Sequence, residues 1–253
     1  MRKASGGRPE DERSDLGDQA YRLLYREIVR CRILPGQDIT EAQMCDTYGL
    51  SRSPVRRALA LLAHDGLITP IPRLGFHVSD ISLVTIRQIF EMRASLEGVA
   101  ARASIGRGDV AALRNLNRRY VEGANAGEHG MMDVHNEMHH MIYAASNNPI
   151  MEKVLNQLLD QSNRIAYFVA KVGGRGNAGS DVTIDEHEVL FKALDTNDPE
   201  NAATQFHFHV RENEQRVVAA LLSSRYFSDL PIRINSDTPR DGLASASVRA
   251  ATT

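Results

Sequence analysis

The sequence predicts a mostly α-helical protein made of two modules, an N-terminal winged helix-turn-helix and a C-terminal antiparallel all-α bundle. Apolar residues recur at the three- and four-residue spacing of helices along most of the chain, and short β-type runs occur only near residues 67–79. The two modules also differ in charge. The segment from residue 21 to residue 57 holds Arg22, Arg26, Arg30, Arg32, Arg52, Arg56 and Arg57, although the net charge of the chain is only −2.

The composition excludes several classes of protein. Hydrophobic residues make up 42% of the 253 residues, which is enough for a folded core in one or two domains. No apolar run approaches the ~20 residues of a membrane span, and the charged start of the chain lacks the apolar segment of a secretory signal. Only two cysteines, Cys31 and Cys45, are present, which is typical of a reducing compartment. We therefore expect a cytoplasmic location, with a disordered arm over residues 1–14 and a disordered tail over residues 230–253.

The first module is expected over residues 15–79 and opens with an amphipathic helix over residues 18–32. Pro35 and Gly36 then form a turn. Thr40, with Gln43 three residues later, has the pattern of a capping box and predicts a second helix that ends at about residue 48. Gly49 is expected to terminate that helix, because glycine adopts the left-handed conformation without strain.

A third helix follows the second after a short turn. Ser53 is expected to be its N-cap, and Pro54 stands at the first helical position, where its missing N–H is not needed. One face of this helix is apolar, with Val55, Ala58, Leu59 and Leu62. Gly66 is expected to end it. Two β-type runs on either side of residues 72–75 predict a hairpin with a basic residue at its tip.

This order of elements is that of a winged helix-turn-helix, in which the start of the basic helix enters the DNA major groove. Arginine there donates paired hydrogen bonds to guanine, and small hydroxyl residues contact phosphates. The alternative is that the arginines form only a solvated face, but they occupy the turn of the helix that reads DNA. We therefore predict DNA contacts from Ser51, Arg52, Ser53, Arg56, Arg57, Arg73 and Gly75.

The segment ILPGQDITEAQMCDTYGLSRSPVRRALALLAHDGLITPIPRLGFHV, residues 33–78, resembles the DNA-binding domain of the GntR family of bacterial transcription regulators. The resemblance covers the whole module. It implies that Ser51, Arg52, Ser53 and Arg56 lie at DNA-contacting positions and that Gly75 is the glycine of the wing. One departure is Ala42, because many relatives carry a basic residue at this position.

The second module is expected over residues 80–229 as six helices joined by short connections. These helices are expected at about residues 82–104, 109–123, 131–147, 149–171, 183–195 and 199–224, with a glycine-rich loop, GGRGNAGS, before the fifth. Such a pattern predicts an antiparallel bundle, whose interior is a natural place for a ligand site.

Several histidines of this module are candidates for a metal site. His135 and His139 are one helical turn apart and point the same way, whereas His140 belongs to a neighbouring face. Such a pair is by itself more often an ordinary surface or core feature. His187 and His209 lie on the expected inner faces of two further helices, so three helices bring imidazoles toward one interior.

This module is similar to the helical effector domain of the FadR group of GntR regulators, the FCD domain, and to its VanR-like six-helix form. The segments that carry the resemblance are EMRASLEGVAARAS, HNEMHHMIYAASNNP, DEHEVLFKAL and NDPENAATQFHFHV. The resemblance implies a divalent metal held by one Asp or Asn and three His. His139, His187 and His209 match the three histidines, and His135 stands where the carboxylate is usual.

A fourth imidazole in place of a carboxylate favours ions that prefer nitrogen ligands, and we expect zinc or nickel. The alternative is that His135 does not bind the ion and water fills its place. A carboxylate metabolite is expected at the open metal positions. Its partner is expected to be Arg93, which alternatively forms a surface salt bridge with Glu97, and Asn163, Arg164 and Tyr167 are expected to line the same cavity.

The two modules together predict a homodimeric, metabolite-responsive transcription regulator, more often a repressor, that binds double-stranded operator DNA and is not an enzyme. One alternative is a DNA-binding dimer whose helical module is only an oligomerisation scaffold. Another is a metalloenzyme fused to a DNA-binding head, with Glu137 or Glu186 as the base. Glu137, however, is two residues from both His135 and His139 and is expected to face away from them.

Overall fold

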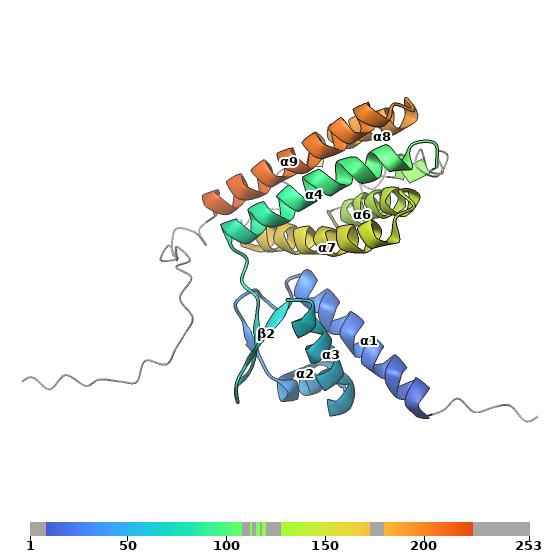
Figure 1. The fold of residues 1–253 in the computed structure, drawn as a ribbon. Helices are drawn as coiled ribbons and strands as arrows, with labels where there is room; N and C mark the ends of the chain where they lie inside the picture. Colours follow the sequence, from blue (N-terminus) through green and yellow to red (C-terminus); the bar gives the residue numbers. More distant parts are fainter. Residues whose placement is uncertain are drawn as a thin grey trace, which may run out of the picture.

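The structure is a computed structural model, and it describes residues 9–107, 128–172 and 180–224, together with positions 112, 115–116 and 118–119. The head contains α1 (Pro9–Val29), β1 (Asp38–Ile39), α2 (Glu41–Tyr48), α3 (Arg52–His64), β2 (Ile68–Ile71) and β3 (Gly75–Val78). The helical domain contains α4 (Leu83–Ser104), α6 (Glu128–Ala145), α7 (Pro149–Val172), α8 (Ser180–Asp195) and α9 (Pro199–Ser223). Figure 1 shows the helical domain stacked on the head, with the end of α1 next to α7. No helix among the described residues is long and apolar enough to cross a membrane.

The first helix begins earlier than expected. Because α1 starts at Pro9, residues 9–14 are helical, whereas the sequence predicted a disordered arm up to residue 14. A proline is well tolerated at the start of a helix. Residues 1–8 and the expected tail at 230–253 lie outside the described residues.

The second helix of the head begins and ends where its local signals predict, whereas the first spans residues 9–29 and not 18–32. The Thr40 side chain accepts from the backbone N–H of Gln43, and the Gln43 side chain accepts from the N–H of Thr40, so the expected capping box is confirmed. Gly49 ends α2 with φ 65°, in the left-handed region. The N-cap of α3 is Ser51 and not Ser53, because the Ser51 carbonyl already accepts from the N–H of Val55.

The wing is a three-stranded antiparallel sheet in the order β1-β3-β2, so the expected hairpin of β2 and β3 gains a short third strand. Two residues of β1 were too few to produce an alternating pattern in the sequence. Gly75 pairs with Ile71 and has φ 125°. A Cβ atom at this position would lie 2.3 Å from the carbonyl oxygen of Ile39, so the close approach of β1 requires glycine here.

In the helical domain α4 is the central element, since it packs against α6, α7 and α9. The ends of the described helices lie within three residues of those predicted, and Ser82 caps α4 by accepting from the N–H of Thr85. The helix expected at about residues 109–123 falls mostly outside the described residues, and so does most of the loop GGRGNAGS. The core around α6 contains Met138, Ile142, Tyr143, Leu155, Leu190 and Phe206.

The head and the helical domain meet along α7. The Tyr25 hydroxyl on α1 donates to the Asp160 carboxylate on α7 at 2.5 Å. Lys171 donates to the carbonyl of Cys31 at 3.0 Å, and Arg164 donates to the carbonyl of Ser79 in the segment that joins the two domains. Polar contacts from one face of α7 therefore connect it both to α1 and to the linker.

Candidate functional site

The predicted DNA-reading residues lie on the exposed surface at the start of α3. Ser51, Arg52, Ser53, Arg56 and Arg57 are all exposed, whereas the apolar face of the same helix is buried. Exposed arginines at the N-terminal turn of this helix match the placement that major-groove readout requires.

Two of these arginines are held by carboxylates of neighbouring helices. The Arg56 guanidinium donates to both oxygens of Glu41 at 3.0 and 3.1 Å, and Arg57 donates to Asp18 at 3.2 Å. The hydrogen bonds from Arg56 lower the pKa of the partly exposed Glu41 carboxyl. Such bridges are weak in water, so both guanidinium groups remain available for an anionic partner.

The tip of the wing lies between the paired residues Ile71 and Gly75 and consists of Pro72, Arg73 and Leu74. Arg73 is exposed and has φ 65°, and Leu74 is the more unusual residue because 71% of its surface is exposed. The geometry places Arg73 at the outermost turn of the hairpin, where the sequence predicted it.

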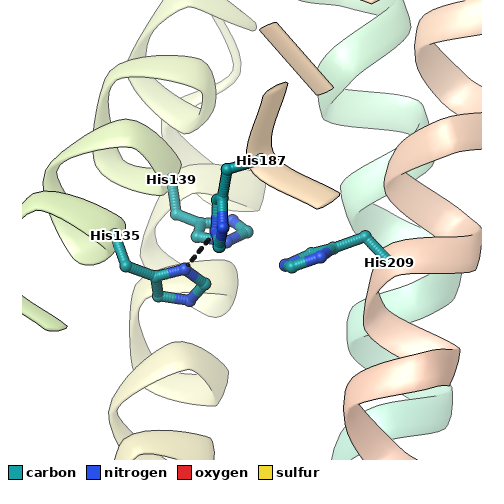
Figure 2. A group of neighbouring side chains, drawn as sticks. All are labelled: His135, His139, His187 and His209. Atoms are coloured by element: carbon teal, nitrogen blue, oxygen red, sulfur yellow. Dashed lines mark hydrogen bonds between the residues drawn. The ribbon is translucent and has the colours of Figure 1, made fainter. Parts of the chain in front are cut away.

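The four predicted metal ligands come together in the helical domain. His135 and His139 project from α6, His187 from α8 and His209 from α9, and Figure 2 shows their rings directed toward one point. One nitrogen from each ring can be chosen so that all four lie within 4.8 Å of one another. His139, His187 and His209 are buried, and His135 is partly exposed. The other two histidines considered above point elsewhere, because His140 contacts Asn156 at 2.7 Å and His207 contacts the carbonyl of Ala94 at 3.2 Å.

The distances are compatible with one ion. In a tetrahedral zinc site with bonds of ~2.0–2.1 Å the nitrogens lie about 3.3–3.4 Å apart, so the ring nitrogens, which here lie within 4.8 Å of one another, would draw together when an ion binds. His135 and His187 already approach to 2.6 Å between ring nitrogens. The Nε2 atom of His139 is buried and has no hydrogen-bond partner. A buried nitrogen without a partner is unfavourable unless it binds something, so the donor set fits a metal ion.

The surroundings favour the neutral form of His135 and His139. Burial lowers the pKa of His135 well below its ordinary value, and the neighbouring histidines His139, His187 and His209 lower it further. Burial also lowers the pKa of His139, although Glu97 opposes this shift. Neutral imidazole is the form that binds metals.

A buried polar network, which the sequence did not reveal as a unit, lies behind His139. Glu97 on α4 lies 3.0 Å from Nδ1 of His139 and accepts from the Tyr143 hydroxyl at 2.7 Å. Arg93, one turn earlier on α4, donates to Glu97 at 2.7 Å and to Ser162 on α7 at 2.6 Å. Burial alone would raise the pKa of Glu97, but Arg93 and His139 hold it below its usual range.

A surface salt bridge with Glu97 was the alternative to an effector-binding role for Arg93, and the structure forms this salt bridge in the core instead of on the surface. Both side chains are almost fully buried, at 1% and 0% exposure. The four-residue spacing of Arg93 and Glu97, and that of His139 and Tyr143, were the signals available in the sequence. Neither spacing indicates burial, because helices carry such pairs mostly on their surfaces.

The remaining residues expected around an effector occupy different places. Asn163 on α7 donates to Asn136, the neighbour of His135, at 3.0 Å, so it lies on the side of α7 that faces α6. Arg164 contacts the linker at Ser79, which places its guanidinium at the junction with the head and not beside the histidines. Tyr167 is half-buried and packs against the apolar cluster of α4, α7 and α9.

Glu137, which would be the general base if the protein were a metalloenzyme, instead forms a salt bridge at the surface. Glu137 on α6 is 44% exposed and forms a salt bridge with Arg119 at 3.0 Å. It therefore faces solvent, as its spacing from His135 and His139 predicted.

Comparison with known proteins supports both the DNA-binding head and the helical domain. Residues 16–78 match the family described as bacterial regulatory proteins of the gntR family, and residues 88–212 match the FCD domain. An uncharacterized HTH-type transcriptional regulator, YdhC of Bacillus subtilis, is 27% identical over 189 residues, which cover 73% of this chain and 83% of that protein. The HTH-type transcriptional repressor GlaR of Escherichia coli is 24% identical over 200 residues, covering 75% of this chain and 90% of GlaR.

A shorter match and a solved structure complete the comparison. The HTH-type transcriptional repressor RspR of Escherichia coli is 38% identical over 87 residues, which are 34% of this chain and 38% of RspR. The structure of E. coli McbR/YncC has the same fold, with a TM-score of 0.69 at 22% identity over 81% of this chain and 96% of that one. The chain therefore belongs to the GntR family of bacterial regulatory proteins and carries an FCD domain, so it is a DNA-binding transcription regulator and not an enzyme.

Proposed function

We propose that this regulator is a repressor whose helical domain binds a divalent metal ion, with zinc or nickel preferred, and uses it to sense a small carboxylate metabolite. The observation that carries the proposal is the meeting of four imidazoles from three helices around one point, with the buried Nε2 of His139 lacking a hydrogen-bond partner. His135, His139, His187 and His209 would hold the ion. When bound, the ion supplies a Lewis-acidic centre to which a carboxylate can attach.

The four-imidazole set has a consequence for the ligand. Neutral imidazoles leave the full charge of a divalent ion uncompensated, whereas a carboxylate ligand would remove part of it. A net positive centre in a buried site attracts an anion. Arg93 would add to this attraction, although its charge is already balanced by Glu97, and Asn163 would contribute a polar contact from α7.

A route from the site to the head runs through α7. This helix carries Ser162 and Asn163, which contact Arg93 and Asn136 on the inner side. It also carries Asp160 and Arg164, which contact Tyr25 of the head and Ser79 of the linker. Ligand binding that displaces α7 would therefore change the position or mobility of the head and so its affinity for DNA.

The regulator is proposed to act as a homodimer on a two-fold operator, because one winged helix makes few specific contacts. Exposed apolar side chains on the outer faces of two helices support an interface there, namely Val84, Met92 and Val99 on α4 and Phe208 and Leu222 on α9. The relatives RspR and GlaR are described as repressors, which supports repression as the outcome.

A thermal-shift screen of small carboxylates tests this function, with the zinc-loaded protein measured in the presence and absence of a chelator. The proposal expects at least one carboxylate to raise the melting temperature of the zinc-loaded protein only, since it binds through the ion. The same acid is expected to weaken binding to DNA selected by this protein from a random library. If the chelated and zinc-loaded proteins melt alike and no acid shifts either, the helical domain is an oligomerisation scaffold.

A further inference from the structure

The ligand set of the candidate metal centre contains no carboxylate, but a buried carboxylate lies directly behind it. Glu97 is fully buried on α4 and lies 3.0 Å from Nδ1 of His139. The opposite ring nitrogen, Nε2, is the one that is buried without a hydrogen-bond partner. The His139 ring therefore has the Glu97 carboxylate near one nitrogen and an unpartnered buried nitrogen on its other side, and Figure 2 shows this ring among the four imidazoles.

The contact with a carboxylate determines which nitrogen of His139 carries the proton. A carboxylate only accepts hydrogen bonds, so the proton of the neutral ring belongs on Nδ1. This leaves the lone pair on Nε2, which is the donor atom that a metal needs. Without the carboxylate, the neutral ring is free to adopt the other tautomer, in which Nε2 carries a proton and cannot bind an ion.

We propose that Glu97 is the positioning residue of the metal centre, which fixes His139 in the metal-binding tautomer and increases the basicity of its Nε2. This inference rests on the proposed metal function and adds a residue that does not touch the ion. Carboxylates that accept from the second nitrogen of a metal-binding histidine have this effect in other metalloproteins, where their loss weakens metal affinity by ~10- to 100-fold.

Glu97 is itself held in one position. Its Oε1 atom accepts from Nε of Arg93 at 2.7 Å and from the hydroxyl of Tyr143 at 2.7 Å. Arg93 is anchored in turn by its bond to Ser162 on α7. The other oxygen, Oε2, is buried without a hydrogen bond and lies 3.0 Å from Nδ1 of His139, so a small rotation of the ring would complete a bond between them.

The competing explanation is that Glu97 only neutralises the buried Arg93. The two explanations differ in what happens when both charges are removed together. If Glu97 serves only Arg93, a variant that lacks both charges binds metal like the wild type. If Glu97 positions His139, that variant still binds metal weakly, because the ring has lost its acceptor charge.

The experiment measures zinc affinity by competition with a chromophoric chelator for the full-length wild type, Glu97→Gln and the double variant Arg93→Met/Glu97→Gln. The double variant leaves no unpaired charge in the core, so it is expected to fold even if Glu97→Gln does not. The ligand-field spectrum of the Co²⁺-loaded proteins is recorded as a second readout of the coordination. Glu200→Gln is the matched control, because Glu200 also pairs with an arginine of α4, Arg102, but lies exposed.

We expect zinc affinity to fall by about 10- to 100-fold in both Glu97 variants, with an altered Co²⁺ spectrum, and to be unchanged in Glu200→Gln. Wild-type zinc affinity and spectrum in the folded double variant would overturn the role of Glu97 and leave the metal centre in place. Failure of the wild type itself to bind zinc would instead refute the proposed function.

Discussion

The head and the helical domain place their charged residues in opposite environments. Arg52, Arg56 and Arg57 of the head project into solvent, whereas Arg93 and Glu97 of the helical domain are buried together with three histidines. An exposed charge contributes little to folding and stays available for a partner such as DNA. A buried charge must be paired where it lies, so its removal affects the fold as well as the site. We therefore expect substitutions of buried charged residues to lower the free energy of unfolding more than substitutions of exposed ones.

The largest effect is expected from Arg93→Met. This change leaves the Glu97 carboxylate buried without its guanidinium partner, and breaking such a pair costs about 3–5 kcal/mol. The free energy of unfolding is measured by urea denaturation. Adding Glu97→Gln to this variant is expected to recover most of the loss. A loss below ~1 kcal/mol for Arg93→Met would contradict the buried network.

A smaller effect is expected from Tyr25→Phe, which removes a hydrogen bond to the Asp160 carboxylate between the two domains. Hydrogen bonds to charged groups contribute about 1.5–3 kcal/mol. Burial raises the pKa of Asp160 while donation from Tyr25 lowers it, so the variant is expected to raise this pKa further in an NMR titration.

Tyr21→Phe is the matched control for this prediction. Tyr21 makes a similar bond to Asp65, also at 2.5 Å, but wholly within the head. Both variants are expected to lose stability. Only Tyr25→Phe is expected to make the linker at residues 79–82 more sensitive to proteolysis. Equal protection of the linker in the two variants would show that Tyr25 does not hold the domains together.

A backbone effect of about 1–3 kcal/mol is expected from Gly75→Ala in the wing. The residue has φ 125°, a conformation that strains an alanine, and the new methyl group would meet the carbonyl oxygen of Ile39. Thermal unfolding followed by circular dichroism measures the loss. Gly49→Ala has a positive φ but open space around it, so a smaller loss is expected there. A larger loss of stability in Gly49→Ala than in Gly75→Ala would refute the steric role of β1.

The smallest effect on stability is expected from Arg56→Ala, within ~0.5 kcal/mol, because the side chain is 73% exposed. Its effect on DNA affinity is expected to be about 1–3 kcal/mol, measured by fluorescence anisotropy on DNA selected by the wild type. Unchanged DNA affinity would remove Arg56 from the predicted readout residues.

The difference between the two domains also explains which features could be predicted from the sequence. The capping box of Thr40 and Gln43, Gly49 and the apolar face of α3 are local signals, and the helices follow them. The histidines were found because His139, His187 and His209 lie on inner faces of helices whose periodicity is clear. Burial of the Arg93–Glu97 pair was not predictable, because it depends on α6, α7 and α9 packing over α4.

Other features depended on contacts distant in sequence. The strand β1 exists only because two residues pair with β3, and so few residues carry no alternating pattern. Arg164 resembled a pocket residue by its position on α7, yet its partner is the carbonyl of Ser79, 85 residues away. The sequence thus predicted elements and their inner faces better than the partners of individual polar side chains.

Equilibrium dialysis against zinc tests the central claim most directly, after the protein has been stripped with a chelator. The wild type and His140→Ala, whose ring contacts Asn156 outside the cluster, are both expected to bind about one zinc ion per chain, whereas His139→Ala is expected to bind far less at the same free zinc concentration. Equal zinc binding by the wild type and His139→Ala would contradict the claim that His135, His139, His187 and His209 form the metal centre.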